Sequence, residues 1–258
     1  MMKRIISVII AALALCTACV KENRSACPCL LRLDFRDVDP AKFAEAKVVV
    51  SSSDGVVFSG VVGSSVFDRE FDVKVPRRKL WVNVYGGECE DADMVRGGLR
   101  IGRGASAPRV FMHSNQVDAD CEMLTEKVDL CKNHCVITIT IKDVSASPFK
   151  FLVRGNINGY GIDGRPGRGD FVYELQPDGS GSAEVVVPRQ LDASLLLDIE
   201  DVTEIVKTFA LGEYVVLSGY DWSSKELKDI AIEIDYARSR IVVTVSGWTE
   251  EYVFEVEI

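Results

Sequence analysis

Apolar and polar residues alternate with a period of two along most of this chain, and this alternation restricts the folds that it can adopt. The alternation is clean over residues 71–75, 80–84, 137–141, 230–234, 241–245 and 252–258. Successive side chains of a strand point to opposite faces, so alternating β-branched residues indicate half-buried antiparallel strands. Helix signals are scarce, and only Pro40 to Ala46 predicts one or two helical turns. The pattern therefore predicts an all-β protein.

Turn signals separate the predicted strands at short intervals. They fall at Asp54-Gly55, Gly86-Gly87, Asp178-Gly179 and Ser246-Gly247. Many short strands joined by frequent turns are typical of antiparallel β-sandwiches, and one sandwich takes about 100 residues. The length of 258 residues therefore predicts two tandem sandwich domains, which we place at residues 30–130 and 131–258.

The first residues have the features of an export signal. Lys3 and Arg4 precede an apolar run, Ile5 to Leu15, which is interrupted by a single serine. The run is too short to span a bilayer, which takes about 20 apolar residues. A charged start followed by a short apolar run and small residues is typical of a secretory signal peptide.

The end of this signal resembles a bacterial lipobox, in which signal peptidase II cuts before an acylated cysteine. The small residues Thr17 and Ala18 directly precede Cys19. The resemblance predicts a lipoprotein signal peptide over residues 1–18, lipid such as palmitate on Cys19, and a lipidated tether over residues 19–29. Acylation at Cys16, or an ordinary cleaved signal without lipid, are the alternatives.

Six cysteines remain beyond the signal and the lipid site. They are Cys27, Cys29, Cys89, Cys121, Cys131 and Cys135. An even number of cysteines in an exported protein favours disulfides, but six cysteines allow about 15 connectivities and the sequence does not select one. If Cys131 and Cys135 share one extended strand they lie roughly 13 Å apart, beyond the ~7 Å limit between disulfide-bonded Cα atoms.

Charge and motifs exclude several classes of function. The formal net charge of −9 is unsuited to nucleic acid, because binding phosphates requires clusters of Lys and Arg. The two histidines, His113 and His134, lie in no H-E-x-x-H motif, and no P-loop or G-x-S-x-G motif is present. We therefore predict no enzyme activity, no cofactor and no metal. A zinc site that joins His134 to Cys131 and Cys135 is the alternative to disulfide-bonded or buried cysteines.

Two further features leave alternatives open. The glycine-rich run from Arg154 to Asp170 predicts a flexible hairpin loop, which ends in the integrin-type tripeptide Arg168-Gly169-Asp170 with no assigned meaning. Exposed aromatic side chains on a β-sandwich could bind sugars, and the three tryptophans are Trp81, Trp222 and Trp248. The structural alternative places Trp81 and Trp248 in the cores and Trp222 in a loop.

Several short segments, in order along the chain, resemble those of a known family. They are Cys27-Pro28 before the strand Leu30 to Phe35, Ala46 to Val50, Trp81 to Gly87, Phe111 to His113, Asp129 to Lys132, Ile234 to Tyr236, and Ile241 to Trp248 with its valine-x-glycine-tryptophan end. In this respect the chain is similar to the fimbrial anchor subunits of Bacteroidetes, in the FimB-type branch of the type V fimbrial lipoproteins. Arg77-Arg78 depart from the family, which usually has a glycine-containing turn there.

The resemblance implies two transthyretin-like sandwiches and a surface-exposed outer-membrane lipoprotein that attaches a fimbrium to the cell. Its partner would be a fimbrial stalk subunit, which donates a strand to an open sheet. We expect the acceptor near Leu30 to Phe35 and Phe71 to Val75, and we expect Glu251 to Ile258 to be the last strand of the chain's own domain. A surface glycan-binding β-sandwich lipoprotein is the alternative function.

Overall fold

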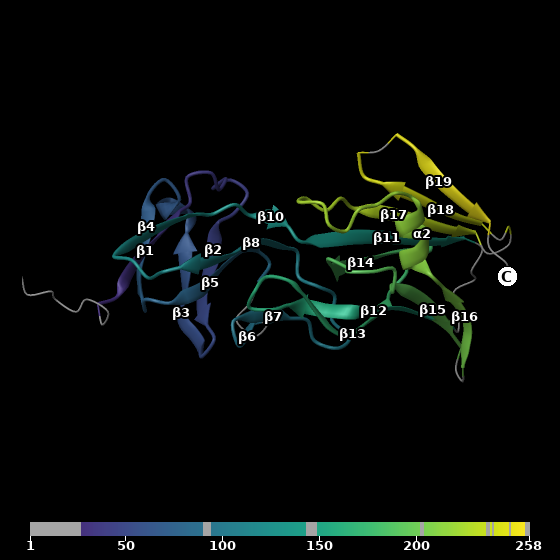
Figure 1. The fold of residues 1–258 in the computed structure, drawn as a ribbon. Coiled ribbons are helices and arrows are strands. Elements are labelled where there is room, and N and C mark those ends of the chain that lie inside the picture. The colour runs from purple at the N-terminus through teal and green to yellow at the C-terminus, as the bar shows by residue number, and fades with distance from the viewer. Residues whose placement is uncertain are drawn as a thin grey trace, which may run out of the picture.

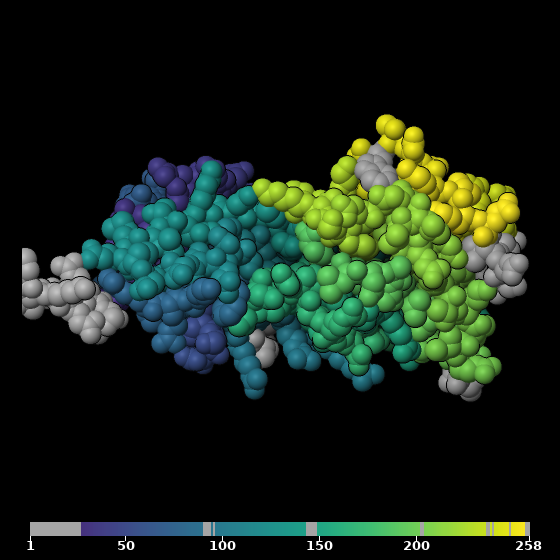
Figure 2. Space-filling model, viewed as in Figure 1, coloured from purple at the N-terminus to yellow at the C-terminus, as the bar shows by residue number. Residues whose placement is uncertain are grey.

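The computed structural model of the protein describes residues 27–89, 94–142, 149–201, 204–235, 238, 240–247 and 249–255. The predicted signal peptide, Cys16, Cys19 and Trp248 lie outside these residues. The described chain is mostly β-strand, and its sheets pack as two sandwiches that follow one another along an elongated molecule (Figures 1 and 2). The predicted class, all-β with tandem β-sandwiches, is confirmed.

The first sandwich packs a three-stranded sheet on a five-stranded one. The smaller sheet has the order β4 (Glu70–Val75), β1 (Cys29–Asp34), β9 (Met123–Lys127), and the larger sheet has the order β10 (Cys131–Lys132), β8 (Val110–Asp118), β5 (Lys79–Gly87), β2 (Glu45–Ser52), β3 (Gly55–Gly63). Alternate residues of β1 and β5, such as Leu31, Leu33, Val82 and Val84, are fully buried in the core between the sheets. A 3₁₀ turn, η2 (Ser64–Val66), leads from β3 towards β4.

The second sandwich has larger sheets and the one α-helix of the described residues. One sheet has the order β14 (Ser182–Pro188), β11 (His134–Lys142), β17 (Ile230–Asp235), β18 (Arg240–Val245), β19 (Glu251–Glu255). The other has the order β16 (Ile205–Phe209), β15 (Leu196–Glu200), β12 (Lys150–Tyr160), β7 (Gly98–Arg100), β6 (Met94–Val95), with β13 (Pro166–Leu175) also paired to β12. The helix α2 (Leu211–Leu217) buries Leu211, Gly212 and Val215 against this core.

Strands β6 and β7 cross between the two halves of the sequence. They come before residue 131, but β7 pairs with β12, where Gly159 and Tyr160 lie opposite Arg100 and Leu99. Leu99 and Ile101 are buried in the second core. The sheet of the second sandwich is therefore completed by chain from the first half, and the domain division at residue 131 stays a prediction.

The alternation predicted the strands well but not all of their partners. Ile137, Ile139 and Ile141 are buried on one face of β11, as expected. However, β11 pairs with β17 in parallel, and β1 pairs with β9 in parallel. Alternation reports which face of a strand is buried, and it carries no information on the direction of the neighbouring strand.

Two expectations about local structure are met in part. The segment from Pro40 to Ala46 makes a single turn, in which the Asp39 carbonyl accepts the Lys42 and Phe43 N–H groups at 3.1 Å and the Asp39 carboxylate accepts the Ala41 N–H at 2.9 Å, and β2 then begins at Glu45. The glycine-rich run forms a hairpin, as predicted, but it is not mostly loop, since most of it lies in β12 and β13. Gly159 has a φ of +148°, and a Cβ atom there would lie 2.1 Å from the Leu99 carbonyl oxygen. The glycine permits close strand pairing.

None of the helices in the described residues has the length and apolar character that a membrane crossing requires.

Candidate functional site

Within the described residues, the three-stranded sheet of the first sandwich ends at β4 and at β9, and β1 lies between them. In the described residues, β1 pairs with β4 on one side and with β9 on the other. The predicted strand pair of β1 and β4 is therefore present, in an antiparallel register that places Arg32 opposite Asp72. Both edges of β1 are occupied, so within the predicted neighbourhood β1 itself has no edge to offer. The outer edge of β4 is unpaired among the described strands.

The free edge of β4 lies beside β3, the free edge of the larger sheet. Phe58 of β3 and Phe71 of β4 are both half-buried, with ring centroids 6.1 Å apart. Both pack against the first core. We call this side of the sandwich, bounded by β3 and β4 and joined by Phe58 and Phe71, the open side.

Strand β3 has the features of an unprotected edge. Three of its valines are exposed: Val56 by 46%, Val57 by 38% and Val61 by 58%. A long edge strand with exposed apolar side chains can pair with another chain, and proteins usually block such edges with charges or proline. On the neighbouring edge strand β4, Glu70 and Asp72 both bind Arg32 of β1, at 2.8 and 2.9 Å, and Lys74 is exposed. Strand β3 itself has no charged residue, so its edge lacks this protection.

Polar contacts close the opposite side of the sandwich. The Glu126 carboxylate of β9 lies 3.0 Å from His113 Nε2 and accepts a hydrogen bond from Asn115 Nδ2 at 2.9 Å, and both partners belong to β8. Burial by itself raises the pKa of Glu126, but the two hydrogen bonds and the charge of His113 outweigh burial and lower it. These contacts join the edges of the two sheets, so this side offers no comparable opening.

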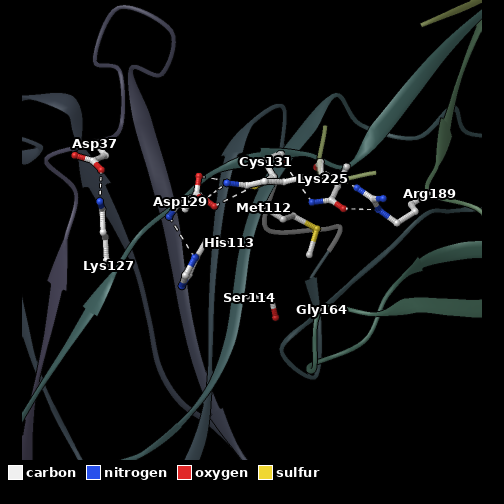
Figure 3. Close-up of a pocket in the computed structure, with 11 residues that line it drawn as sticks. Asp37, Met112, His113, Ser114, Lys127, Asp129, Cys131, Gly164, Arg189 and Lys225 are labelled. Atoms are coloured by element: carbon white, nitrogen blue, oxygen red, sulfur yellow. Dashed lines mark hydrogen bonds and ion pairs between the residues drawn. The ribbon is translucent and has the colours of Figure 1, made fainter. Parts of the chain in front are cut away.

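A polar cavity of about 760 Å³ lies next to this closed side, where the two sandwiches meet (Figure 3). Its lining includes Asp37, His113, Lys127, Asp129, Cys131, Asn133, Arg189 and Lys225. Most of its charged groups are already paired: Lys127 binds Asp37, and Lys225 Nζ lies 2.5 Å from an Asp129 carboxylate oxygen. The Arg189 guanidinium donates to Asn133 Oδ1 at 2.9 Å.

The only thiol that lines this cavity is poorly placed to act as a nucleophile. Cys131 is half-buried, and its nearest charged partner is the carboxylate of Asp129, at 3.8 Å. Burial, followed by the negative charge of Asp129, raises the pKa of Cys131. Reactive cysteines have lowered pKa values beside cationic groups. The polar contacts of this cavity therefore link the two sandwiches to each other.

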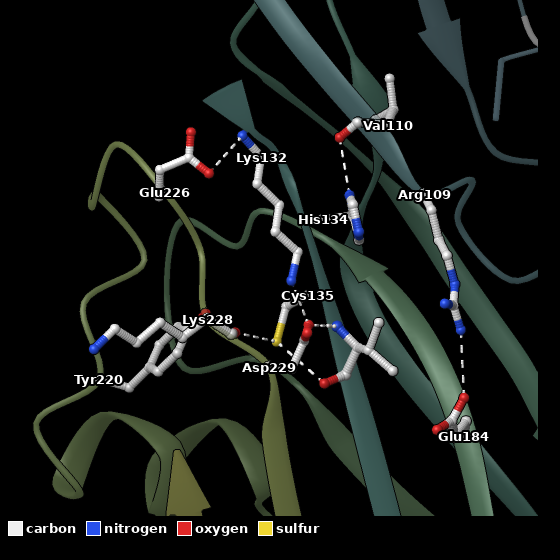
Figure 4. A network of polar contacts seen from close by, with 11 residues as sticks. Arg109, Val110, Lys132, His134, Cys135, Glu184, Tyr220, Glu226, Lys228 and Asp229 are labelled. Atoms are coloured by element: carbon white, nitrogen blue, oxygen red, sulfur yellow. Dashed lines mark hydrogen bonds and ion pairs between the residues drawn. The ribbon is translucent and has the colours of Figure 1, made fainter. Parts of the chain in front are cut away.

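A second polar network fixes the start of β11 against the loop that precedes β17 (Figure 4). Lys132 Nζ lies 2.6 Å from Asp229 Oδ1, which also accepts the Val136 N–H at 2.8 Å. His134 is buried, its Nδ1 lies 2.9 Å from the Val110 carbonyl oxygen, and burial lowers its pKa. The Cys135 thiol donates to the Lys228 carbonyl at 3.2 Å, and burial raises its pKa to about 12.

The structure separates the residues of the alternative zinc site. Cys131 is on β10 and His134 and Cys135 are on β11, which belong to different sheets. The His134 ring and the Cys135 thiol each contact a backbone carbonyl. No group of three His, Cys, Asp or Glu side chains in the described residues could hold a metal ion.

The other predicted residues lie on elements other than β3 and β4. Trp222 is in a loop as expected, yet it is only 7% exposed and packs edge-on against Tyr220 at 4.8 Å. Trp81 is half-buried on β5. Arg168 of the Arg-Gly-Asp tripeptide is on β13 and lies 3.6 Å from Asp192. Neither tryptophan side chain is fully exposed as a stacking surface for a sugar.

The six cysteines do not form one cluster. Cys29 opens β1 and is fully buried, and Cys121 lies just before β9. Their sulfur atoms are 3.8 Å apart. Cys89 lies 3.8 Å from the sulfur of Met94, and Cys27 is exposed. The sequence indicated the neighbourhood of β1 and β4 but not the pairing of Phe58 with Phe71, because those residues lie in different sheets.

Neither a protein-family model nor a curated protein sequence matches the chain. Its fold, however, is similar to solved structures at low sequence identity. One is a protein of Bacteroides thetaiotaomicron described as a candidate polysaccharide-binding protein, with a TM-score of 0.59 and 12% identity over 89% of this chain and 98% of the other. Another is the fimbrial anchor protein Mfa2 of Porphyromonas gingivalis, with a TM-score of 0.58 and 12% identity over 86% of this chain and 98% of the other.

A third similar structure is a candidate adhesin of Bacteroides thetaiotaomicron, with a TM-score of 0.52 and 13% identity over 90% of this chain and 99% of the other. The likeness extends over both sandwiches in all three cases. At these identities it establishes a shared fold.

Proposed function

We propose that this chain is an outer-membrane lipoprotein that anchors a fimbrium to the cell surface and ends its polymer at the base. The observation that carries the proposal is the shared fold with a fimbrial anchor protein over nearly the whole of that protein. The predicted lipid site at Cys19 supports the same role, because several acyl chains on one cysteine hold a protein firmly to a membrane. The proposed role is non-enzymatic.

The open side is the proposed acceptor for a donor strand from the first stalk subunit. An incoming strand would form main-chain hydrogen bonds with the outer edge of β4 and extend the three-stranded sheet. Its inward side chains would cover Phe58 and Phe71, which are half-buried without it. The closed side is less suitable, because the contacts of Glu126 with β8 already join the two sheets there.

The anchoring role can be tested in cells. We expect deletion of the gene to leave fimbriae that assemble but are shed into the medium, and that are longer than normal because nothing ends them at the base. Cys19→Ser should reproduce the shedding, and the matched variant Cys16→Ser should leave fimbriae attached. Retention and length that are unchanged in the deletion strain would defeat the anchor proposal and leave the glycan-binding alternative.

The acceptor site can be tested with purified protein and a peptide that copies the donor strand of the cognate stalk subunit. We expect Phe71→Ser to weaken binding of the peptide at least ~10-fold, because it removes apolar surface that the strand would cover. Phe254→Ser is a matched control, since Phe254 is a half-buried aromatic residue on the edge strand β19 and packs on Tyr214 at 5.2 Å. Equal affinities of the two variants would place the acceptor elsewhere.

A further inference from the structure

Cys29 and Cys121 hold their sulfur atoms 3.8 Å apart at the start of two adjacent strands. Cys29 opens β1, and Cys121 lies two residues before β9. The two strands are parallel, with Leu30 opposite Met123, and the Leu30 N–H donates to the Glu122 carbonyl at 2.9 Å. The backbones that carry the two cysteines are therefore held together by the sheet.

The backbone geometry suits a disulfide. Neighbouring strands lie about 4.8 Å apart and an offset of one residue adds about 3.3 Å, so the Cα atoms would be about 6 Å apart if the ladder of β1 and β9 were extended back to Cys121. Disulfides span Cα separations of about 4.4–6.8 Å. Cys29 is fully buried in the first core and Cys121 packs against that core, so both side chains point to the same region.

We propose that Cys29 and Cys121 form a structural disulfide in the exported protein. Closing the bond shortens the sulfur separation from 3.8 Å to about 2.05 Å. Cys121 is the less constrained partner, because it is only partly buried and lies in the bend before β9, whereas Cys29 is fully buried at the start of the central strand β1. A rotation of the Cys121 side chain, which donates to the Met123 carbonyl at 3.3 Å, would bring the sulfurs together.

The two thiols differ in exposure, so we expect the more exposed Cys121 to react with an oxidant first and the buried Cys29 to react second. The oxidant is a disulfide compound, either a small-molecule disulfide or the disulfide form of a thiol oxidoreductase. The Cys121 thiolate attacks one of its sulfurs, forms a mixed disulfide and releases one thiol. Cys29 then loses its proton and attacks the Cys121 sulfur, which releases the second thiol. Two thiols are oxidised and one disulfide is reduced to two thiols.

The burial of Cys29 is consistent with its role as the second thiol. Burial, followed by the hydrogen bond with Cys121, raises the pKa of Cys29 to about 11. A buried thiol of this kind is a slow nucleophile towards an external oxidant. Once Cys121 carries the mixed disulfide, its sulfur lies next to Cys29. The attack by Cys29 is then intramolecular, and this closeness compensates for its low reactivity.

The proposal is tested first on protein from its native compartment. Cells are lysed in N-ethylmaleimide, and the purified protein is digested with trypsin without reduction. Trypsin cuts after Arg24, Arg32, Arg109 and Lys127, so mass spectrometry should find peptide 25–32 linked to peptide 110–127. Alkylated Cys29 and alkylated Cys121 in the wild-type protein would overturn the proposal.

The link must then be assigned, because peptide 25–32 contains both Cys27 and Cys29. We expect Cys27→Ser to keep the linked pair of peptides, and Cys29→Ser and Cys121→Ser to abolish it. A link that survives in Cys29→Ser but not in Cys27→Ser would assign the disulfide to Cys27 and overturn the pairing proposed here.

Stability gives an independent readout. Cys121→Ser should lower Tm by about 5–10 °C, because the bond closes a long loop in the unfolded chain. Reduction of the wild-type protein should lower Tm by a similar amount, and reduction of Cys121→Ser should change nothing further. If reduction leaves the Tm of the wild type unchanged, no stabilising bond joins these residues.

Discussion

Glu126 shows how one residue closes a sandwich edge. Its side chain is only 12% exposed, and it bridges β9 to His113 and Asn115 of β8. A buried carboxylate without partners would be destabilising, whereas one that accepts two hydrogen bonds joins the two sheets.

We expect Glu126→Gln to lower the free energy of unfolding at pH 7 by about 1–2 kcal/mol, because a charge-assisted acceptor becomes a neutral amide. The folded pKa of Glu126 lies below the ordinary value of 4.5, so the carboxylate stabilises the folded protein above pH 4.5. That contribution falls away as the pH drops through the lower folded pKa. Urea unfolding across this range measures the difference, with the exposed Glu251→Gln as control. A deficit that is the same at all pH values would contradict the prediction.

At the scale of the element, β12 depends on its glycines. Its first half is flanked by β13 and β15, and its end pairs with β7. At Gly159 the backbone of β7 lies too close for any side chain. A glycine in a strand interior costs stability by itself, and here it permits a pairing that alanine would block.

We expect Gly159→Ala to destabilise the protein by about 1–3 kcal/mol and to detach β7. The Ile101 N–H donates to the Asn158 carbonyl at 2.8 Å, so its hydrogen exchange should accelerate at least ~10-fold. Gly102→Ala is the matched control, because no atom lies within 4 Å of a Cβ at that position. Unchanged protection of Ile101 in Gly159→Ala would show that the close approach is not required.

The same element shows where sequence-based reasoning ends. Alternation predicted β11, β17 and β18, because it records which face of a strand meets the core. It could not predict that β11 and β17 run in parallel or that β7 reaches β12, since strand partners depend on contacts distant in the sequence. The glycines of β12 predicted a flexible loop, because their contact with the distant strand β7 is not visible in the sequence. Likewise, the acceptor neighbourhood was predicted at β1 and β4, but the free edge and its contact with Phe58 required the sheet order.

At the scale of the whole molecule, residues that precede the predicted boundary at residue 131 contribute to the second core. Leu99 precedes the predicted boundary at residue 131 but is 2% exposed within the second core. We expect Leu99→Ala to cost about 2–5 kcal/mol, as large-to-small core substitutions do. It should accelerate hydrogen exchange in β11 and β17, as Leu197→Ala of the second core should.

Leu33→Ala, in the first core, is the comparison for this prediction. It should accelerate exchange in β1 and β2 instead. Hydrogen exchange followed by mass spectrometry in mild denaturant distinguishes the two patterns. If Leu99→Ala accelerates exchange mainly in β1 and β2, the segment before residue 131 belongs energetically to the first sandwich.

The position of β1 has a mechanical consequence. Six residue pairs join β1 to β4 and five join it to β9, so ladders flank it on both sides. Suppose that the chain is tethered to the membrane just before β1, as we propose, and that a pull on the fimbrium acts along the axis of this strand. The bonds of both ladders then carry the load together in shear, rather than opening one after another as in a peeled edge strand. Strand β1, the strand nearest to the cell, would then hold the fimbrium against detachment by flow.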